Sequence, residues 1–163
     1  MVAGLDGVYI YNGCPEAQSL VKDSRFSKHV TALLMILQGP DSYALIIDDN
    51  VMFYENFKNQ LYKFILLLPY DFDLLYIGGG EHVSNLAPIP SIYLQSDSGA
   101  GVRNYKQLTK WGFSTVISKN CAKKIISELI SKEQVKIPME EWIEKTVNKL
   151  NCKIYWSEPH ITY

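Results

Sequence analysis

The sequence has few cysteines, and they are widely spaced. Cys14, Cys121 and Cys152 are too few and too scattered for a disulfide framework, and no C-x-x-C pair is present to indicate zinc or redox chemistry. We interpret the three as small buried thiols in a reducing compartment. An excess of positive charge is also lacking, because 16 basic and 17 acidic residues leave a net charge of −1. Nucleic acid is therefore not an expected partner.

Long apolar runs are missing as well. The longest, at residues 64–69, is far short of the roughly 20 residues that a membrane-spanning helix needs. The N-terminus, MVAGLDG, has no basic segment followed by an apolar stretch, so we do not interpret it as a signal peptide. We expect a cytoplasmic protein without a membrane span. Abundant Lys, Ile, Asn and Tyr with scarce Ala and Arg are typical of AT-rich coding genomes, such as those of protists or large DNA viruses.

What is present is the composition of a globular chain. Its 163 residues are 47% hydrophobic and 20% charged, which excludes a disordered tail or a collagen-like rod. A chain of this length buries a core of its own, so we expect a single domain over residues 1–163.

Apolar periodicity predicts alternating strands and helices. Short runs of apolar, β-branched and aromatic residues predict strands at residues 7–11, 43–47, 73–77, 112–117 and 153–156. Apolar stripes bounded by Gly or Pro predict helices at residues 24–37, 55–68, 119–131 and 138–150. This alternation predicts an α/β fold with a mostly parallel sheet flanked by helices.

Two stretches carry further expectations. The strand at 43–47 is continuously apolar, which is typical of a strand buried on both faces. Beyond Gly78, about 30 residues show little periodicity, and we expect a structureless lid or binding loop there, most flexible at residues 96–101.

An acidic cluster follows the strand at 43–47. Ligands of open α/β sheets bind outside the carboxyl ends of strands, where Asp48, Asp49 and Asn50 stand. Asp48 and Asn50 point to the same side of an extended segment, and two such oxygen donors hold a hard divalent cation. Asp49 points to the other side. The alternative is that the three residues shape a turn or cap the helix predicted from residue 55.

Residues 44–50 resemble the opening strand of response-regulator receiver domains. In those domains an acidic pair binds magnesium beside a phosphorylated Asp on a later strand. Here the next predicted strand ends in Gly78, and the nearest downstream aspartate, Asp97, lies in a Ser/Gly-rich segment. The receiver domain is therefore the less favoured resemblance.

A second resemblance, to glycosyltransferases with a GT-A fold, covers about residues 24–160. It is strongest to family 25, the lipopolysaccharide and procollagen galactosyltransferases. Five segments carry it in order: SKHVTAL, ALIIDDNV, DFDLLYIG, GFSTVISKNCAKK and PMEEW. The resemblance implies a GT-A-like, Rossmann-like sheet and a metal-dependent hexosyltransferase. Such an enzyme moves a sugar from a nucleotide donor, with a UDP-sugar favoured, to a hydroxyl of a glycan or glycoprotein, with Mn²⁺ or Mg²⁺ as cofactor.

The chain departs from the family in two places. Where the family usually has Glu-Asp-Asp, this chain has Asp48, Asp49 and Asn50, so an amide replaces one metal-facing carboxylate. The segment before Ser24 is also short, whereas the family begins with a further strand and helix that contact the nucleotide base. A donor site lacking this segment favours the alternative function, a non-catalytic nucleotide- or carbohydrate-binding module.

The resemblance implies roles at the metal and donor sites. Asp48 and Asn50 would contact the metal, with His160 as a third ligand. Asp49 would contact the ribose or the donor sugar, and His29 would help to position the donor. The alternatives are an exposed tail histidine for His160 and a structural histidine for His29.

The resemblance also implies catalytic and acceptor-binding residues. Glu140 or Glu141 would be the general base that takes the proton from the acceptor hydroxyl if the reaction inverts the anomeric centre. Alternatively, these glutamates complement the dipole of the helix that they begin. Trp111, Tyr105 and Tyr93 would stack on a sugar ring, or else they pack in the core or at its rim.

Overall fold

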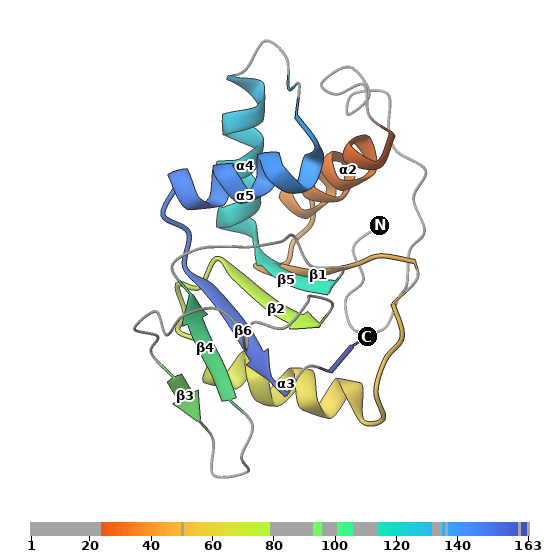
Figure 1. Cartoon of the computed structure of the whole chain (residues 1–163), viewed down its shortest axis with the longest axis vertical. Coiled ribbons are helices and arrows are strands. Elements are labelled where there is room, and N and C mark those ends of the chain that lie inside the picture. The colour runs from red at the N-terminus through yellow and green to blue at the C-terminus, as the bar shows by residue number, and fades with distance from the viewer. Residues whose placement is uncertain are drawn as a thin grey trace.

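The computed structural model describes residues 24–49, 51–78, 93–95, 101–105, 114–131, 135, 137–159 and 161–162. Figure 1 shows their arrangement. In chain order the elements are α2 (Ser24–Gln38), β1 (Tyr43–Ile47), α3 (Phe57–Leu67), β2 (Leu74–Gly78), β3 (Tyr93–Gln95), β4 (Gly101–Tyr105), β5 (Ser114–Ser118), α4 (Lys119–Ile130), α5 (Met139–Lys149) and β6 (Ile154–Glu158).

The strands form one mixed sheet in the order β1-β5-β2-β6-β4-β3. This confirms the α/β class, but the prediction of a mostly parallel sheet is wrong. Among the described strands only β2 and β6 pair in parallel, and the other four pairings are antiparallel. The physical reason is the placement of β5, which runs antiparallel between β1 and β2. Those two strands still point the same way, and α3 connects them.

The outer position of β1 corrects a second expectation. Its five residues were expected to be buried on both faces, yet only Ala44 is buried, and Tyr43 is 44% exposed. The reason is that β1 pairs with β5 alone among the described strands and forms one edge of the sheet. By contrast, β2 lies between β5 and β6, and all five of its residues are buried.

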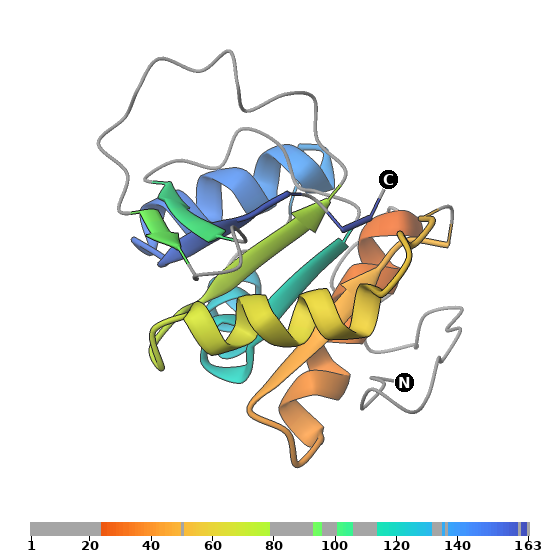
Figure 2. The same cartoon turned by 90° about the horizontal axis from the view of Figure 1, so that it is seen from below.

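Helices cover both faces of the sheet. One core joins α2, α4 and α5 to one face, with Val30, Ile125 and Ile143 fully buried. A second core joins α3 to the opposite face through Leu61 and Phe64. Figure 2 shows α3 crossing its face of the sheet, with the other helices behind. Each fully buried aliphatic or aromatic side chain contributes about 1.5–3 kcal/mol to folding.

The segment beyond Gly78 was expected to be a structureless loop. The structure describes its residues 93–95 and 101–105, and these form β3 and β4, which pair with each other. β4 also pairs with β6 along its whole length, from Gly101 opposite Glu158 to Tyr105 opposite Ile154. Backbone pairing with a distant strand supplies the order that the local sequence does not signal. The strand predicted at residues 7–11 lies outside the described residues.

None of the described helices combines the length and the apolar character that a membrane crossing requires.

Candidate functional site

The candidate site lies at the end of the sheet at which the carboxyl ends of β1 and β2 both emerge. Ile47, the last residue of β1, pairs with Ser114 at the start of β5, and Gly78 at the end of β2 faces the same serine. Asp48 therefore emerges beside the carboxyl end of a second strand. This is the position in which α/β sheets bind ligands.

Asp48 faces His29 of α2. Side chains alternate along β1, so Asp48 is directed to the same face as Ala44 and Ile46, which is the face that α2 covers. The His29 Nε2 lies 3.5 Å from the Asp48 Oδ1, and the two side chains are only 9% and 19% exposed. Sequence reasoning selected both residues for separate roles, and the structure brings them together.

A turn begins at Asp48. The Val51 N–H donates to the Asp48 carbonyl oxygen over 3.3 Å, and Asp49 is exposed to solvent. Asn50, the other predicted metal ligand, lies outside the described residues. The hydrogen bond between Asp48 and Val51 therefore agrees with the turn interpretation. The Asp48 carboxylate is partly buried just after the carboxyl end of β1.

The C-terminal residues Ile161 and Thr162 connect the end of β2 to the chain after this turn. Phe53 and Gly78 both form bridges with Thr162, and the Ile161 N–H donates to the Ile77 carbonyl oxygen over 2.8 Å. A buried hydrogen bond joins the hydroxyls of Thr162 and Ser114. The contacts of Thr162 with Phe53, Gly78 and Ser114 were not predicted from the sequence, because no local pattern links residue 162 to strands so far away along the chain.

His160, the third predicted metal ligand, also lies outside the described residues. Its neighbour Ile161 is described and lies at the end of β2, where its N–H donates to the Ile77 carbonyl oxygen.

The first turn of α5 lies near the beginning of α2. The rings of Phe26 and Trp142 are 5.2 Å apart at their centroids. Glu141, in the same turn as Trp142, is exposed, and its Oε1 lies 2.5 Å from the Lys145 Nζ. For Glu140, only the backbone belongs to the described part of the chain. The pairing of Glu141 with Lys145 on the helix surface agrees with a structural role for this glutamate. Its exposed carboxylate is also accessible enough to act as a general base.

Of the three predicted acceptor-binding aromatics, only the backbones of Tyr93 and Tyr105 are described. Tyr93 begins β3 and Tyr105 ends β4, and their side chains are outside the described set, as is all of Trp111. β4 is the fourth strand from β1, a separation of roughly 19 Å at about 4.8 Å per strand. The backbone of Tyr105 is therefore far from that of Asp48 across the sheet.

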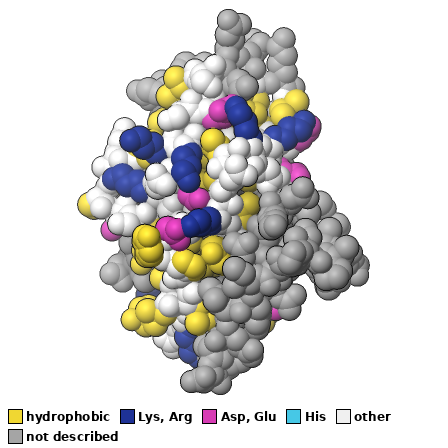
Figure 3. Space-filling view, turned by 90° about the vertical axis from the view of Figure 1, so that its left-hand side faces the viewer, with side chains coloured by type: hydrophobic (Ala, Val, Ile, Leu, Met, Phe, Trp, Pro, Cys, Tyr) yellow, Lys and Arg dark blue, Asp and Glu magenta, His cyan; other side chains and the backbone are white. Residues whose placement is uncertain are grey.

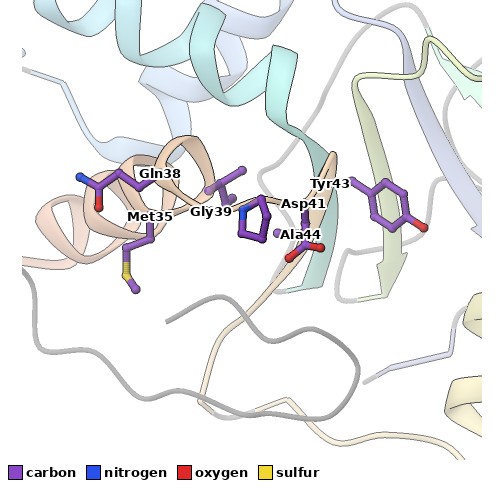
Figure 4. A pocket seen from close by; sticks show the side chains of 8 residues that line it. Met35, Gln38, Gly39, Asp41, Tyr43 and Ala44 are labelled. Atoms are coloured by element: carbon purple, nitrogen blue, oxygen red, sulfur yellow. The ribbon is translucent and has the colours of Figure 1, made fainter.

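A pocket of about 320 Å³ lies at the start of β1, not at its end. Figure 4 shows its lining between the last turn of α2 and the first residues of β1, including Gly39, Asp41 and Ala44. Asp48 is four residues beyond Ala44, the last residue of the lining, about 13 Å at roughly 3.3 Å per residue of extended chain. The pocket is therefore distinct from the candidate site.

No protein-family model and no curated protein matches this chain. The resemblance to glycosyltransferase family 25 therefore depends on the residues of this chain alone.

Proposed function

We propose that the protein is a glycosyltransferase that moves a sugar from a nucleotide-sugar donor to a hydroxyl of a glycan or glycoprotein. The observation that carries this proposal is the position of Asp48. Its carboxylate is 19% exposed and lies at the carboxyl end of a strand, held by His29, instead of pointing into bulk solvent. An acidic residue placed in this way suits the diphosphate end of a donor that is bound with a divalent cation.

Asp48 supplies a carboxylate oxygen of the kind that a hard cation prefers. Asp49 is exposed to solvent and keeps the role at the ribose or donor sugar that the resemblance implies. A bound Mn²⁺ or Mg²⁺ would act as a Lewis acid on the leaving diphosphate. The contribution of the protein is to orient Asp48 through His29 and to close the end of β2 through the hydrogen bond between Ser114 and Thr162. Glu141 is the described candidate for accepting the proton of the acceptor hydroxyl.

The test combines binding with turnover. The protein is incubated with Mn²⁺ and a panel of UDP- and GDP-sugars. The melting temperature and the release of nucleoside diphosphate are then measured, with and without EDTA. We expect one donor to raise the melting temperature in a Mn²⁺-dependent way, because a ligand of the folded state stabilises it by mass action. Asp48→Asn should remove this shift.

Asp41→Asn is the matched control. Asp41 is an exposed aspartate just before β1, at the opposite end of that strand from Asp48. This variant should keep the wild-type response. Binding without release of nucleoside diphosphate would favour the binding module, and equal responses of the two variants would contradict the proposed site.

A further inference from the structure

A second group of metal-binding side chains lies at the opposite end of the sheet from Asp48. Asp73 directly precedes β2, Cys121 is in the first turn of α4, and Cys152 lies two residues before β6. Their ligand atoms all lie within 4.8 Å of one another, and all three residues are buried. Both cysteines are free thiols.

Backbone hydrogen bonds hold the three segments together. The Asp73 N–H donates to the Lys153 carbonyl oxygen over 3.0 Å, and the Ser118 N–H donates to the Asp73 carbonyl oxygen over 2.9 Å. The Ser118 hydroxyl in turn accepts from the Cys121 N–H over 3.1 Å at the start of α4. The positions of Asp73, Cys121 and Cys152 are thus set by the sheet and by a helix cap, not by flexible side chains alone.

We propose that Asp73, Cys121 and Cys152 bind a zinc ion. The Cys121 and Cys152 sulfur atoms are 3.8 Å apart. Two sulfurs that each lie about 2.3 Å from a tetrahedral zinc ion are separated by roughly 3.8 Å, so the thiols already have the spacing of a zinc site. Two thiolates also select a soft or borderline ion over Mg²⁺ or Ca²⁺.

Hydrogen bonds from Lys124 and Lys153 fix the orientation of the Asp73 carboxylate. The Lys124 Nζ lies 2.9 Å and 3.2 Å from its two oxygens, and the Lys153 N–H donates to Oδ2 over 3.0 Å. Partners of this kind fix the direction of a ligating carboxylate. Lys124 is therefore a positioning residue of the site.

The charges balance when zinc binds. Without metal, the Asp73 carboxylate is compensated by the Lys124 ammonium group. On binding, each thiol releases one proton to solvent and forms one bond from sulfur to zinc. The two negative charges of the thiolates cancel the two positive charges of the ion, so no net charge is added to a buried environment. A zinc ion with three protein ligands keeps one coordination position for water or another donor.

The test uses Co²⁺ as a spectroscopic substitute for Zn²⁺. The reduced, metal-free protein is titrated with Co²⁺ and then with Zn²⁺, and native mass spectrometry counts the bound ions. We expect one ion per chain, near-ultraviolet absorption from thiolate-to-cobalt charge transfer, the intense visible bands of tetrahedral cobalt, and displacement by one equivalent of zinc. The absence of these bands and of a zinc adduct in the reduced wild-type protein would overturn the proposal.

Variants identify the ligands. Cys121→Ser and Cys152→Ser should each lower zinc affinity by more than the roughly tenfold loss expected for Lys124→Met, a change in a positioning residue. Cys14→Ser is the matched control and should bind as the wild type does, and so should Asp48→Asn, which separates this site from the proposed donor site. Circular dichroism verifies that each variant is folded. Loss of cobalt binding in Cys14→Ser, with retention in a folded Cys121→Ser or Cys152→Ser, would contradict the assignment.

Discussion

Gly78 and Thr162 are in direct backbone contact at the end of β2. An added Cβ at Gly78 would lie 1.9 Å from the Thr162 Oγ1, 2.3 Å from its carbonyl oxygen and 2.8 Å from its carbonyl carbon. The Thr162 hydroxyl is meanwhile hydrogen-bonded to Ser114. Glycine is therefore required here because a bridge from the C-terminal segment approaches the strand closely.

Gly78→Ala should destabilise the protein by about 1–3 kcal/mol, because two of the three clashing atoms belong to backbone and cannot rotate away. Urea unfolding followed by circular dichroism measures the change. Gly39→Ala is the matched control, since a Cβ there would meet only the Met35 carbonyl oxygen at 3.4 Å and the Ile36 carbonyl oxygen at 3.8 Å. If Gly78→Ala lowers the free energy of unfolding no more than Gly39→Ala does, the segment at Thr162 can move to accommodate the added methyl group at little energetic cost.

The ion pair between Lys124 and Asp73 should contribute more to stability than an ion pair on the surface. Asp73 is buried, so Lys124→Met leaves a buried carboxylate whose remaining described partner is the Lys153 N–H. We expect a loss of about 2–3 kcal/mol, less than the 3–5 kcal/mol typical of fully buried pairs because Lys124 itself is 35% exposed.

Lys145→Met provides the comparison for this loss. Lys145 pairs with the exposed Glu141 four residues earlier, and both side chains are open to solvent. Its removal should change the free energy of unfolding by no more than about 0.5 kcal/mol. Figure 3 shows one face of the molecule on which lysine and carboxylate side chains adjoin in this way. Equal losses in the two variants, measured at the same ionic strength, would mean that burial of Asp73 does not strengthen its pair.

The Ser118 hydroxyl caps α4 by accepting from the Cys121 N–H over 3.1 Å. Ser118→Ala should cost about 1 kcal/mol, the usual loss when a helix N-cap is removed. Ser118→Thr keeps the hydroxyl and should retain most of the wild-type stability. The melting temperatures of the two variants test this role. If both fall equally below that of the wild type, the hydroxyl does not act as a cap.

Local sequence signals predicted the elements well. Apolar stripes and terminal Gly or Pro residues placed the four described helices within one or two residues, as for the helix predicted at 24–37 and observed as α2 at Ser24–Gln38. These signals depend only on neighbours along the chain. Strand direction depends on which distant segments pair, so the antiparallel insertion of β5 between β1 and β2 was not predictable from helix–strand alternation. The same limit applies to β4, whose pairing with the distant β6 is entirely tertiary.

The candidate site was predictable only where it depends on neighbours along the chain. The position of Asp48 at the end of a strand follows from its place after an apolar run. Its contact with His29 does not, because it requires α2 to lie on one particular face of β1. Likewise, the sequence shows Cys121 and Cys152 as scattered residues, and only the packing of α4 beside the start of β6 brings their sulfurs to 3.8 Å.

Glu144 on α5 should make the protein more stable in its protonated form. Burial raises the pKa of this carboxyl group above its ordinary value of 4.5, and the negative charge of Glu141 raises it further, while Lys145 lowers it. Because the pKa is higher in the folded state, the stabilising contribution is complete below pH 4.5 and is lost as the pH rises through the folded value. Glu144→Gln should therefore be more stable than the wild type at pH 7, by roughly 0.2–0.5 kcal/mol for a solvent-screened pair of like charges. This advantage should disappear below pH 4.5, as measured by urea unfolding at both pH values.

A second variant separates the two causes of this shift. Glu141→Gln removes the neighbouring charge but leaves Glu144 where it is, so an NMR titration of the Glu144 side-chain carboxyl should show a lower pKa than in the wild type. Burial is the larger cause, so the value should remain above 4.5. A pKa of Glu144 that falls to 4.5 or below in Glu141→Gln would assign the shift to the charge of Glu141 instead of to burial on α5.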